Sequence, residues 1–409
     1  MCTMYLCVKK NFKYTMLFFT RYLKLILKLK QKKISENLFN QCHLWLIYLS
    51  KKRKSTKMKQ LCFFLFFPFL TFAQNRTALE RAVKDAMTHK INMDTAKTTA
   101  WVIGCIDGDS AWVFGYGRLS KETKDKPDGN TIFEVGGVTK AFTATVIHFL
   151  VQNKKLDYEA KINTYLTDNQ RFALGNKITL LQLMTHTSGL PKVLEALHND
   201  EKDRDQPYAD YTEGMLFDGL RGLDSTDSKI GQYKYSHLNH AILEKIIQNK
   251  GAIDDLKAIE NHADTSLHYT YAQGYSPAQK PTPNWIHNET FKYSNGLKLN
   301  AHDLLDFLKT HLGIRDKDFY NILKETQEPL FKTDVDKDTK VGKIWHVMKQ
   351  KKTPKIYIQT GSTNGQAAFI GFVPETKTGV VVLTNSRLVQ ANLGLMILRI
   401  LNENWKRKG

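Results

Sequence analysis

The stretch from Phe133 to Thr145 reads FEVGGVTKAFTAT, and it marks the start of a helix. Two adjacent glycines are followed by apolar residues at helical spacing. These residues are Val138, Phe142, Val146, Phe149 and Leu150. Because a helix brings positions i and i+3 onto one face, Gly137 and Lys140 are expected to lie side by side. The helix therefore presents a lysine one turn after a position that has no side chain.

Strands are expected on both sides of this helix in the chain. Ala100–Ile106 and Ala111–Gly115 flank the turn sequence Asp-Gly-Asp-Ser, which predicts a hairpin. Near the C-terminus, apolar runs predict four successive strands over Lys343–Met348, Lys355–Gln359, Ala367–Phe372 and Gly379–Thr384. The fold class expected from this pattern is α/β, with an antiparallel sheet flanked by helices. We expect residues 74–156 and 313–409 to form this α/β lobe together.

The remaining segments are mostly helical. Helices are expected over Asn75–Met87, Tyr233–Ile247, Asn300–Leu312 and Leu393–Trp405. A further helix begins at Thr179, where Thr and a glutamine three residues later form a capping box, and it is expected to end near Ser188, before Gly and Pro. Residues 157–312 are therefore expected to form a mostly helical inserted lobe.

The net charge of +20 is concentrated at the N-terminus. Residues 1–57 contain 14 Lys and Arg residues and one acidic residue, so this segment carries +13. With Lys59 set aside, the remaining chain carries +6. A nucleic-acid-binding domain needs a basic face on its folded part, so this distribution argues against nucleic acid as a partner.

Residues 58–73 have the pattern of a signal peptide: a lysine, an apolar run and a small residue, Ala73, before the expected cut. The apolar run is too short to span a bilayer, which takes ~20 residues. The mature protein is therefore expected to begin near Gln74, to be periplasmic or extracellular, and to have no stable membrane span. We interpret residues 1–57 as lying upstream of the true start, Met58; the alternative is a basic amphipathic membrane arm around Leu23–Lys33.

Of the five cysteines, only Cys105 follows the expected cut. A single cysteine forms no internal disulfide, and an exported protein of this size does not need one. Because Cys105 lies in the apolar run WVIGCI, it is expected to be a core residue.

Three short motifs follow one another along the chain: Gly137-Val138-Thr139-Lys140, Tyr235-Ser236-His237 and Gln359-Thr360-Gly361-Ser362. With ITLLQLMTHTSGLP (residues 178–191) and FIGFVPETKTGVVVLTNS (residues 369–386), they resemble the serine β-lactamase and penicillin-binding-protein superfamily. The likeness is to the class C β-lactamase, esterase and DD-peptidase branch, and it covers about residues 99–386.

The resemblance implies specific roles and specific departures. In the family the first motif is Ser-x-x-Lys, in which the lysine takes a proton from the nucleophilic serine; here Gly137 stands at the serine position and Lys140 is kept. The second motif is Tyr-x-Asn; Tyr235 is kept for proton transfer, whereas His237 replaces the amide that holds substrate. The third motif has a cation before Thr-Gly.

At that third motif Gln359 replaces the cation, while Thr360 and Gly361 remain. The resemblance also implies an oxyanion hole made by the backbone N–H groups of Gly137 and Ser362, which need no side chain. The expected function is therefore an exported, catalytically impaired or inactive relative that binds a small-molecule or peptidoglycan-like ligand in the old cleft. No cofactor and no metal is implied.

The alternative is an active hydrolase of β-lactamase, esterase or DD-peptidase type, or a variant of an active parent with serine in place of Gly137. No second Ser-x-x-Lys occurs in the sequence, and Thr139 points about 200° away from Gly137 on a helix. Ser236 is the first candidate for a substitute nucleophile. An accidental or engineered change would affect Gly137 alone. Because His237 and Gln359 also differ from the family pattern, we favour the impaired or inactive relative over this alternative.

Several other polar residues have structural interpretations. His186 and Ser188 belong to the loop that ends a helix, and Trp101 belongs to the core. His237 and His240 lie at i and i+3 on the expected helix, but no third ligand for a metal follows at a recognisable spacing. His302 and Asp303 begin an ordinary amphipathic helix.

Overall fold

The computed structural model of the protein describes residues 77–88, 99–194, 206–223, 229–260, 269–288, 290–350, 353–387 and 390–403. The chain divides into two compact units, one formed by residues 1–79 and 261–268 and the other by residues 80–260 and 269–409. The first unit lies almost entirely outside the described residues, as do the expected N-terminal extension and signal peptide. The following description therefore concerns the second unit.

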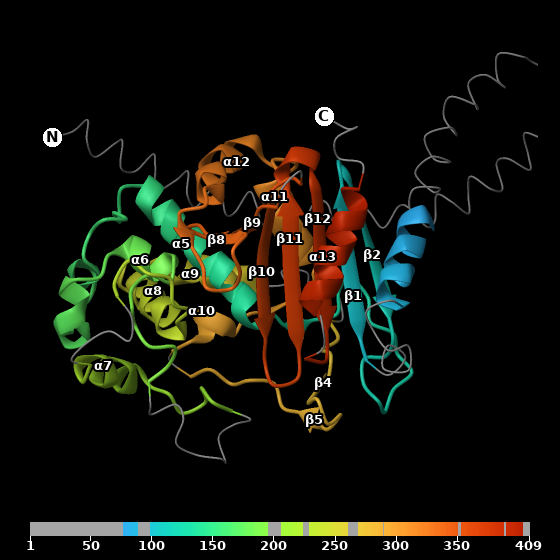
Figure 1. Ribbon diagram of the computed structural model, residues 1–409. Coiled ribbons are helices and arrows are strands. Elements are labelled where there is room, and N and C mark those ends of the chain that lie inside the picture. Colours follow the sequence, from blue (N-terminus) through green and yellow to red (C-terminus); the bar gives the residue numbers. More distant parts are fainter. Residues whose placement is uncertain are drawn as a thin grey trace, which may run out of the picture. The chain divides into compact units, whose positions relative to one another are not determined.

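The centre of this unit is an antiparallel sheet of eight strands in the order β2-β1-β12-β11-β10-β9-β8-β7 (Figure 1). The strands are β1 Trp101–Asp107, β2 Ser110–Tyr116, β7 Phe331–Lys332, β8 Thr339–Val341, β9 His346–Met348, β10 Ile356–Ser362, β11 Ala367–Val373 and β12 Thr378–Thr384. β1 pairs with β12, with Cys105 opposite Val380. The sheet thus joins the two ends of the described chain, and the predicted fold class is confirmed.

The sheet is covered on both faces, because alternate side chains of a strand point to opposite sides. On β11, Phe369 lies against α13 (Gln390–Leu401), while Phe372 contacts His311 of α11 (Ala301–His311). All residues of β11 and β12 are consequently buried. This explains why these strands read as continuous apolar runs instead of alternating with polar residues.

Most of the other helices lie to one side of the sheet, left of β10 in Figure 1. They are α5 Thr139–Gln152, α6 Leu180–Met184, α7 Glu213–Arg221, α8 His237–Asn249, α9 Ile253–Glu260, α10 Lys292–Asn295 and α12 Lys317–Leu323. α5 packs against α8, α9, α10 and α12, and its side chains are buried nearly all round. The other strands form two short antiparallel pairs outside the large sheet. One pair is β3 Phe133–Glu134 with β6 Lys298–Leu299, and the other is β4 Gly274–Tyr275 with β5 Pro281–Thr282.

Most predicted elements are confirmed, with shifted ends. The hairpin of β1 and β2, the helix at 77–88 and α11 lie within two residues of their predicted bounds. α5 contains the predicted apolar positions from Phe142 to Leu150 and begins directly after Val138. α8 begins at His237 and not at Tyr233, because Ser236 is extended and the His237 N–H donates to the Lys192 carbonyl.

The helix that begins at the Thr179 capping box ends at Met184, four residues earlier than predicted. His186 adopts a left-handed conformation with φ 55°, which no α-helix continues through. The short strands β7 and β8 were not predicted, and the bounds of the two lobes stay a prediction. Within the described ranges, no helix is both long and apolar enough to cross a membrane.

Candidate active site

The three motifs found in the sequence meet where the first turn of α5, strand β10 and the segment before α8 come together. A 3-10 turn, Gly136–Val138, leads into α5 and packs directly on β10. Gly136 has φ +49°, and a Cβ on it would lie 2.6 Å from the Ser362 nitrogen. A Cβ on Gly361 would lie 2.1 Å from the Val135 carbonyl oxygen. Two backbones therefore touch here, and only glycine permits that approach at these positions.

Gly137 faces the same contact. A Cβ at this position would lie 2.8 Å from the Thr360 carbonyl oxygen and 3.6 Å from the Tyr235 hydroxyl. The first distance is shorter than Cβ contacts normally become, and the atom met is backbone, so a side chain at 137 requires β10 to shift. Position 137 therefore points toward Tyr235 and the Thr360–Gly361 peptide, as the motif order predicts.

Lys140 is buried one helical turn after Gly137, with 3% of its surface exposed. Its ammonium group donates a hydrogen bond to the Ser294 carbonyl oxygen at 2.8 Å and lies 5.5 Å from the centre of the Tyr235 ring. Burial lowers the pKa of Lys140 to about 7. Among the described residues, the hydrogen-bond acceptor of Lys140 is thus a main-chain oxygen, and Tyr235 contributes its ring nearby.

The carbonyl that accepts from Lys140 belongs to α10, a one-turn helix held from several sides. The Glu244 carboxylate accepts from the Tyr293 N–H at 3.0 Å, and the Thr143 hydroxyl donates to the Tyr293 carbonyl. The Ser294 hydroxyl donates to the His237 carbonyl at 3.3 Å. Side chains of α5 and α8 therefore fix the position of α10 and with it the acceptor of Lys140.

Tyr235 is supported from behind by His186, whose ring centre lies 4.6 Å from that of the tyrosine. The Ser236 N–H donates to His186 Nδ1 at 3.2 Å, so Nδ1 carries no proton. Asn239 directs its amide nitrogen to the same atom and accepts from the Ser188 hydroxyl at 2.7 Å. Burial, reinforced by His240 and Lys140, holds the pKa of His186 well below its usual range. A neutral histidine thus positions the tyrosine.

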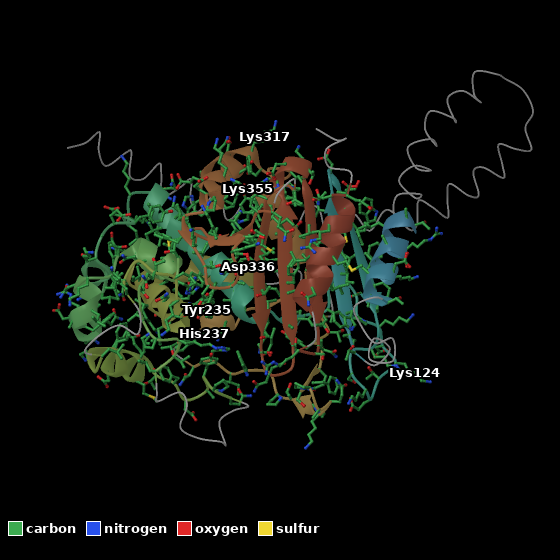
Figure 2. All side chains as sticks on the ribbon, viewed as in Figure 1. Lys124, Tyr235, His237, Lys317, Asp336 and Lys355 are labelled. Carbon is green, nitrogen blue, oxygen red and sulfur yellow. The ribbon has the colours of Figure 1, made fainter. Side chains whose placement is uncertain are left out.

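Tyr235 and His237 lie next to each other at the start of α8 (Figure 2), with ring centres 5.2 Å apart. Burial raises the pKa of Tyr235, so its hydroxyl stays protonated. Burial, with the charges of Lys140 and Lys192, lowers the pKa of His237 to about 2. Nδ1 of His237 is buried without a hydrogen-bond partner in the structure. The site therefore contains a neutral phenol and a neutral imidazole.

The remaining motif residues lie on or near β10. The side-chain amide of Gln359 donates to the Ile344 carbonyl, whereas Thr360 and Ser362 are exposed. Ser236 is fully buried, and its hydroxyl donates to the Pro191 carbonyl at 2.6 Å. That hydroxyl is therefore occupied by a main-chain acceptor and does not face Lys140.

Residues for which structural roles were expected do have structural contacts. Asp303 closes the N-terminal capping box of α11 with Asn300, and Trp101 and Cys105 are fully buried in β1. Burial raises the pKa of the Cys105 thiol to about 12. Among the residues that the structure describes, no group of three or more His, Cys, Asp or Glu side chains is placed to hold a metal ion.

Sequence reasoning missed Ser294 and Glu244. Ser294 acts through its main-chain oxygen, which leaves no signature in a sequence. Glu244 reads as a polar residue of an amphipathic helix, yet it is only 2% exposed and bonds to the Tyr293 N–H. Neither carries a motif, so only the folded arrangement reveals them.

Comparisons with known proteins agree with this arrangement. The beta-lactamase family model matches residues 79–250. A beta-lactamase from Providencia stuartii is 26% identical over 325 residues, which cover 68% of this chain and 80% of that protein. A solved class C beta-lactamase matches with a TM-score of 0.67 at 19% identity, over 81% of this chain and 97% of that chain.

The octameric penicillin-binding protein homologue from Pyrococcus abyssi has a similar fold. It matches with a TM-score of 0.65 at 20% identity, over 80% of this chain and 77% of that chain. The family model, the sequence relative and the solved structures thus all belong to one group of related proteins, the beta-lactamases and penicillin-binding proteins.

Proposed function

The chain belongs to the serine β-lactamase and penicillin-binding-protein superfamily, and on this premise we propose that it has lost covalent catalysis and binds a ligand in the inherited cleft. In this proposal Gly137 occupies the position of the nucleophilic serine. The observation that carries it is that position 137 points at the Tyr235 hydroxyl and at β10 but has no side-chain atom to attack with. Removing a covalent nucleophile costs orders of magnitude in rate.

The surroundings support binding without acylation. Gly137 opens a helix, so its N–H and the positive end of the helix dipole favour a carbonyl or anionic group. Tyr235 supplies a protonated hydroxyl and His237 a neutral ring with an unpartnered nitrogen. A carbonyl-containing small molecule, such as a peptidoglycan-like peptide, is the ligand class that these groups fit.

The decisive experiment measures covalent labelling by a reporter penicillin. The mature protein should form no acyl-enzyme, because Gly137 has no hydroxyl to place about 3 Å from a bound carbonyl carbon in line with the oxyanion donors. Gly137→Ser should label slowly, because it restores the hydroxyl at the cost of a displaced β10. Gly137→Ala is the matched control: it has the same close contact with Thr360 but no hydroxyl, and it should not label.

Labelling of the unmodified protein would contradict the proposal and favour the alternative, an active hydrolase with another nucleophile. Ser236→Ala would then be the first variant to test, although the Ser236 hydroxyl donates to Pro191. If Gly137→Ser also fails to label, equilibrium binding of a peptide ending in D-Ala-D-Ala decides. Binding that Tyr235→Phe and Lys140→Met weaken supports a ligand cleft, and an absence of binding rejects it.

We propose further that the protein is exported and that its mature form begins near Gln74. The basis is the signal-peptide pattern of residues 58–73. The intact mass of the protein recovered outside the cytoplasm should match a chain that starts there. A mass that includes residues 1–57 would reject this processing.

A further inference from the structure

Lys140 has an unusual environment for a buried cation. Ion pairs elsewhere join lysines to carboxylates, but among the described residues no carboxylate lies within ion-pair distance of Lys140. Its hydrogen-bond partner is the Ser294 carbonyl. Taking a charge out of water without a counter-charge is costly, and a protein avoids that cost by neutralising the group. Because burial lowers its pKa to about 7, about half of the Lys140 side chains are amines with a free lone pair at neutral pH.

The titratable groups around this amine do not supply the missing charge. Tyr235 lies beneath it, and His186, His237 and His240 lie close enough for their pKa values to be lowered by it. The phenol and the imidazoles are all neutral near pH 7 for the reasons given above. The Glu244 carboxylate accepts from the Tyr293 N–H at 3.0 Å, and burial raises its pKa to about 7. The amine thus faces protonated oxygen and neutral nitrogen only.

A neutral lysine amine is a nucleophile in its own right. In a protein with Ser-x-x-Lys, a lysine of this kind would take the serine proton. Here the position one turn earlier is Gly137, so no hydroxyl competes with Lys140 for an incoming carbonyl group. One N–H of the amine is directed to Ser294, which fixes the nitrogen while its lone pair stays available.

We propose that Lys140 is a nucleophilic amine that forms a reversible imine with a small aldehyde bound in this cleft. This inference rests on the proposed function in one respect, the absence of a serine at position 137. It adds a ligand class, aldehydes, and a covalent but reversible mode of binding.

The reaction is balanced without an oxidant or reductant. The nitrogen lone pair bonds to the aldehyde carbon, and the carbonyl π electrons move to oxygen, which takes a proton from the Tyr235 hydroxyl. Tyr235 recovers a proton from the nitrogen, so it ends neutral, in agreement with its raised pKa. The carbinolamine then loses its hydroxyl, with the second nitrogen proton, as water, and a C=N bond forms.

The test is reductive trapping with benzaldehyde and cyanoborohydride on the mature protein at pH 7.5, followed by peptide mass spectrometry. The internal control is Lys245, which is equally buried but lies 3.1 Å from the Glu213 carboxylate. Exposed lysines have a neutral fraction on the order of one in a thousand at this pH. Lys140 should therefore be benzylated at least about tenfold faster than Lys245 or the average exposed lysine.

The pH profile and one variant separate reactivity from exposure. Labelling of Lys140 should level off just above pH 7, whereas that of exposed lysines should keep rising toward pH 10. Tyr235→Phe keeps the ring and removes the proton relay, so it should slow labelling of Lys140 about tenfold or more and leave other lysines unchanged. A thermal melt close to that of the unmodified protein verifies that this variant is folded.

Labelling of Lys140 no faster than that of Lys245 would overturn the inference, whatever the cause. Its failure is distinguishable from failure of the proposed function. If the protein forms no acyl-enzyme with penicillin and Lys140 is also unreactive, the imine is rejected while the loss of acylation stands. If penicillin labels the unmodified protein, the proposed function is rejected, and the trapping result still decides whether Lys140 is reactive.

Discussion

Lys140 on α5 and Lys245 on α8 are both buried, on helices that pack together, yet their surroundings differ. Lys245 lies 3.1 Å from the carboxylate of Glu213 on α7. Lys140 donates to a main-chain carbonyl and has no carboxylate within ion-pair distance among the described residues. One lysine is part of an ion pair that joins two helices, and the other is an isolated amine. Two lysines that are equally buried therefore differ in their roles: Lys245 belongs to a structural ion pair, and Lys140 is available for chemistry.

The largest expected effect is the pH dependence of stability caused by Lys140. Its pKa is about 7 in the folded protein and near 10.5 in an unfolded chain, so the unfolded state binds more protons between these values. The contribution of Lys140 to the free energy of unfolding should be constant below pH 7 and rise by about 4 kcal/mol up to pH 10.5.

This contribution is measured as the difference in urea unfolding between the unmodified protein and Lys140→Met, at several pH values. The subtraction cancels the tyrosines and other groups that titrate in the same range. A difference that stays flat from pH 7 to 10.5 would show that Lys140 is protonated in the folded state.

The next effect is the contrast between the two lysine deletions at pH 7. Lys245→Met removes the cation that pairs with Glu213, whose carboxylate keeps the hydrogen bond from the Gln170 amide, and should lower the free energy of unfolding by about 2–3 kcal/mol. Lys140→Met removes the cost of neutralising a buried lysine, about 4 kcal/mol at pH 7 by the same linkage, and leaves one acceptor at Ser294 unpaired, so it should raise the free energy of unfolding by about 2–3 kcal/mol. Urea denaturation measures both, and equal losses would remove the contrast.

Glu213→Gln should make Lys245 more like Lys140. The glutamine keeps the shape but removes the negative charge 3.1 Å from the ammonium group. Because Glu213 is about one-third exposed, the loss of stability should be modest, about 1–2 kcal/mol. Labelling of Lys245 by benzaldehyde should increase severalfold, as mass spectrometry would reveal; an unchanged rate would show that Glu213 does not limit the reactivity of Lys245.

The smallest effect concerns the acceptor of Lys140. Thr143→Val keeps the shape of the side chain but removes the hydroxyl that donates to the Tyr293 carbonyl of α10. We expect a loss of about 1 kcal/mol of stability and a change in Lys140 labelling of less than threefold. A larger change in labelling than in stability would show that α10 controls the reactivity of Lys140 directly.

The fold was largely predictable because its signals are local. The turn between β1 and β2, the capping boxes at Thr179 and Asn300 and the apolar runs of β11 and β12 each follow from neighbouring residues. Helix ends were less predictable because they depend on distant partners. α8 starts at His237 only because its N–H meets the Lys192 carbonyl, which the sequence does not place nearby.

The candidate site was predicted in part. The motifs correctly indicated that Gly137, Lys140 and Tyr235 approach one another. They did not indicate that Lys140 bonds to Ser294, nor that Lys140 lacks the counter-charge that Lys245 has. Those facts depend on which carbonyl and which carboxylate the fold brings to each lysine, and they distinguish two residues that look alike in the sequence.

The backbone contact between Gly137 and β10 also bears on how this protein can change over generations. A substitution that adds a side chain at 137 brings a Cβ to 2.8 Å from the Thr360 oxygen. Such overpacking typically costs about 1–3 kcal/mol. A serine or alanine at 137 is therefore accepted without loss of stability only if the backbone at this contact also shifts. Removing a side chain at this position needs no such adjustment, so the two directions of change are not equivalent.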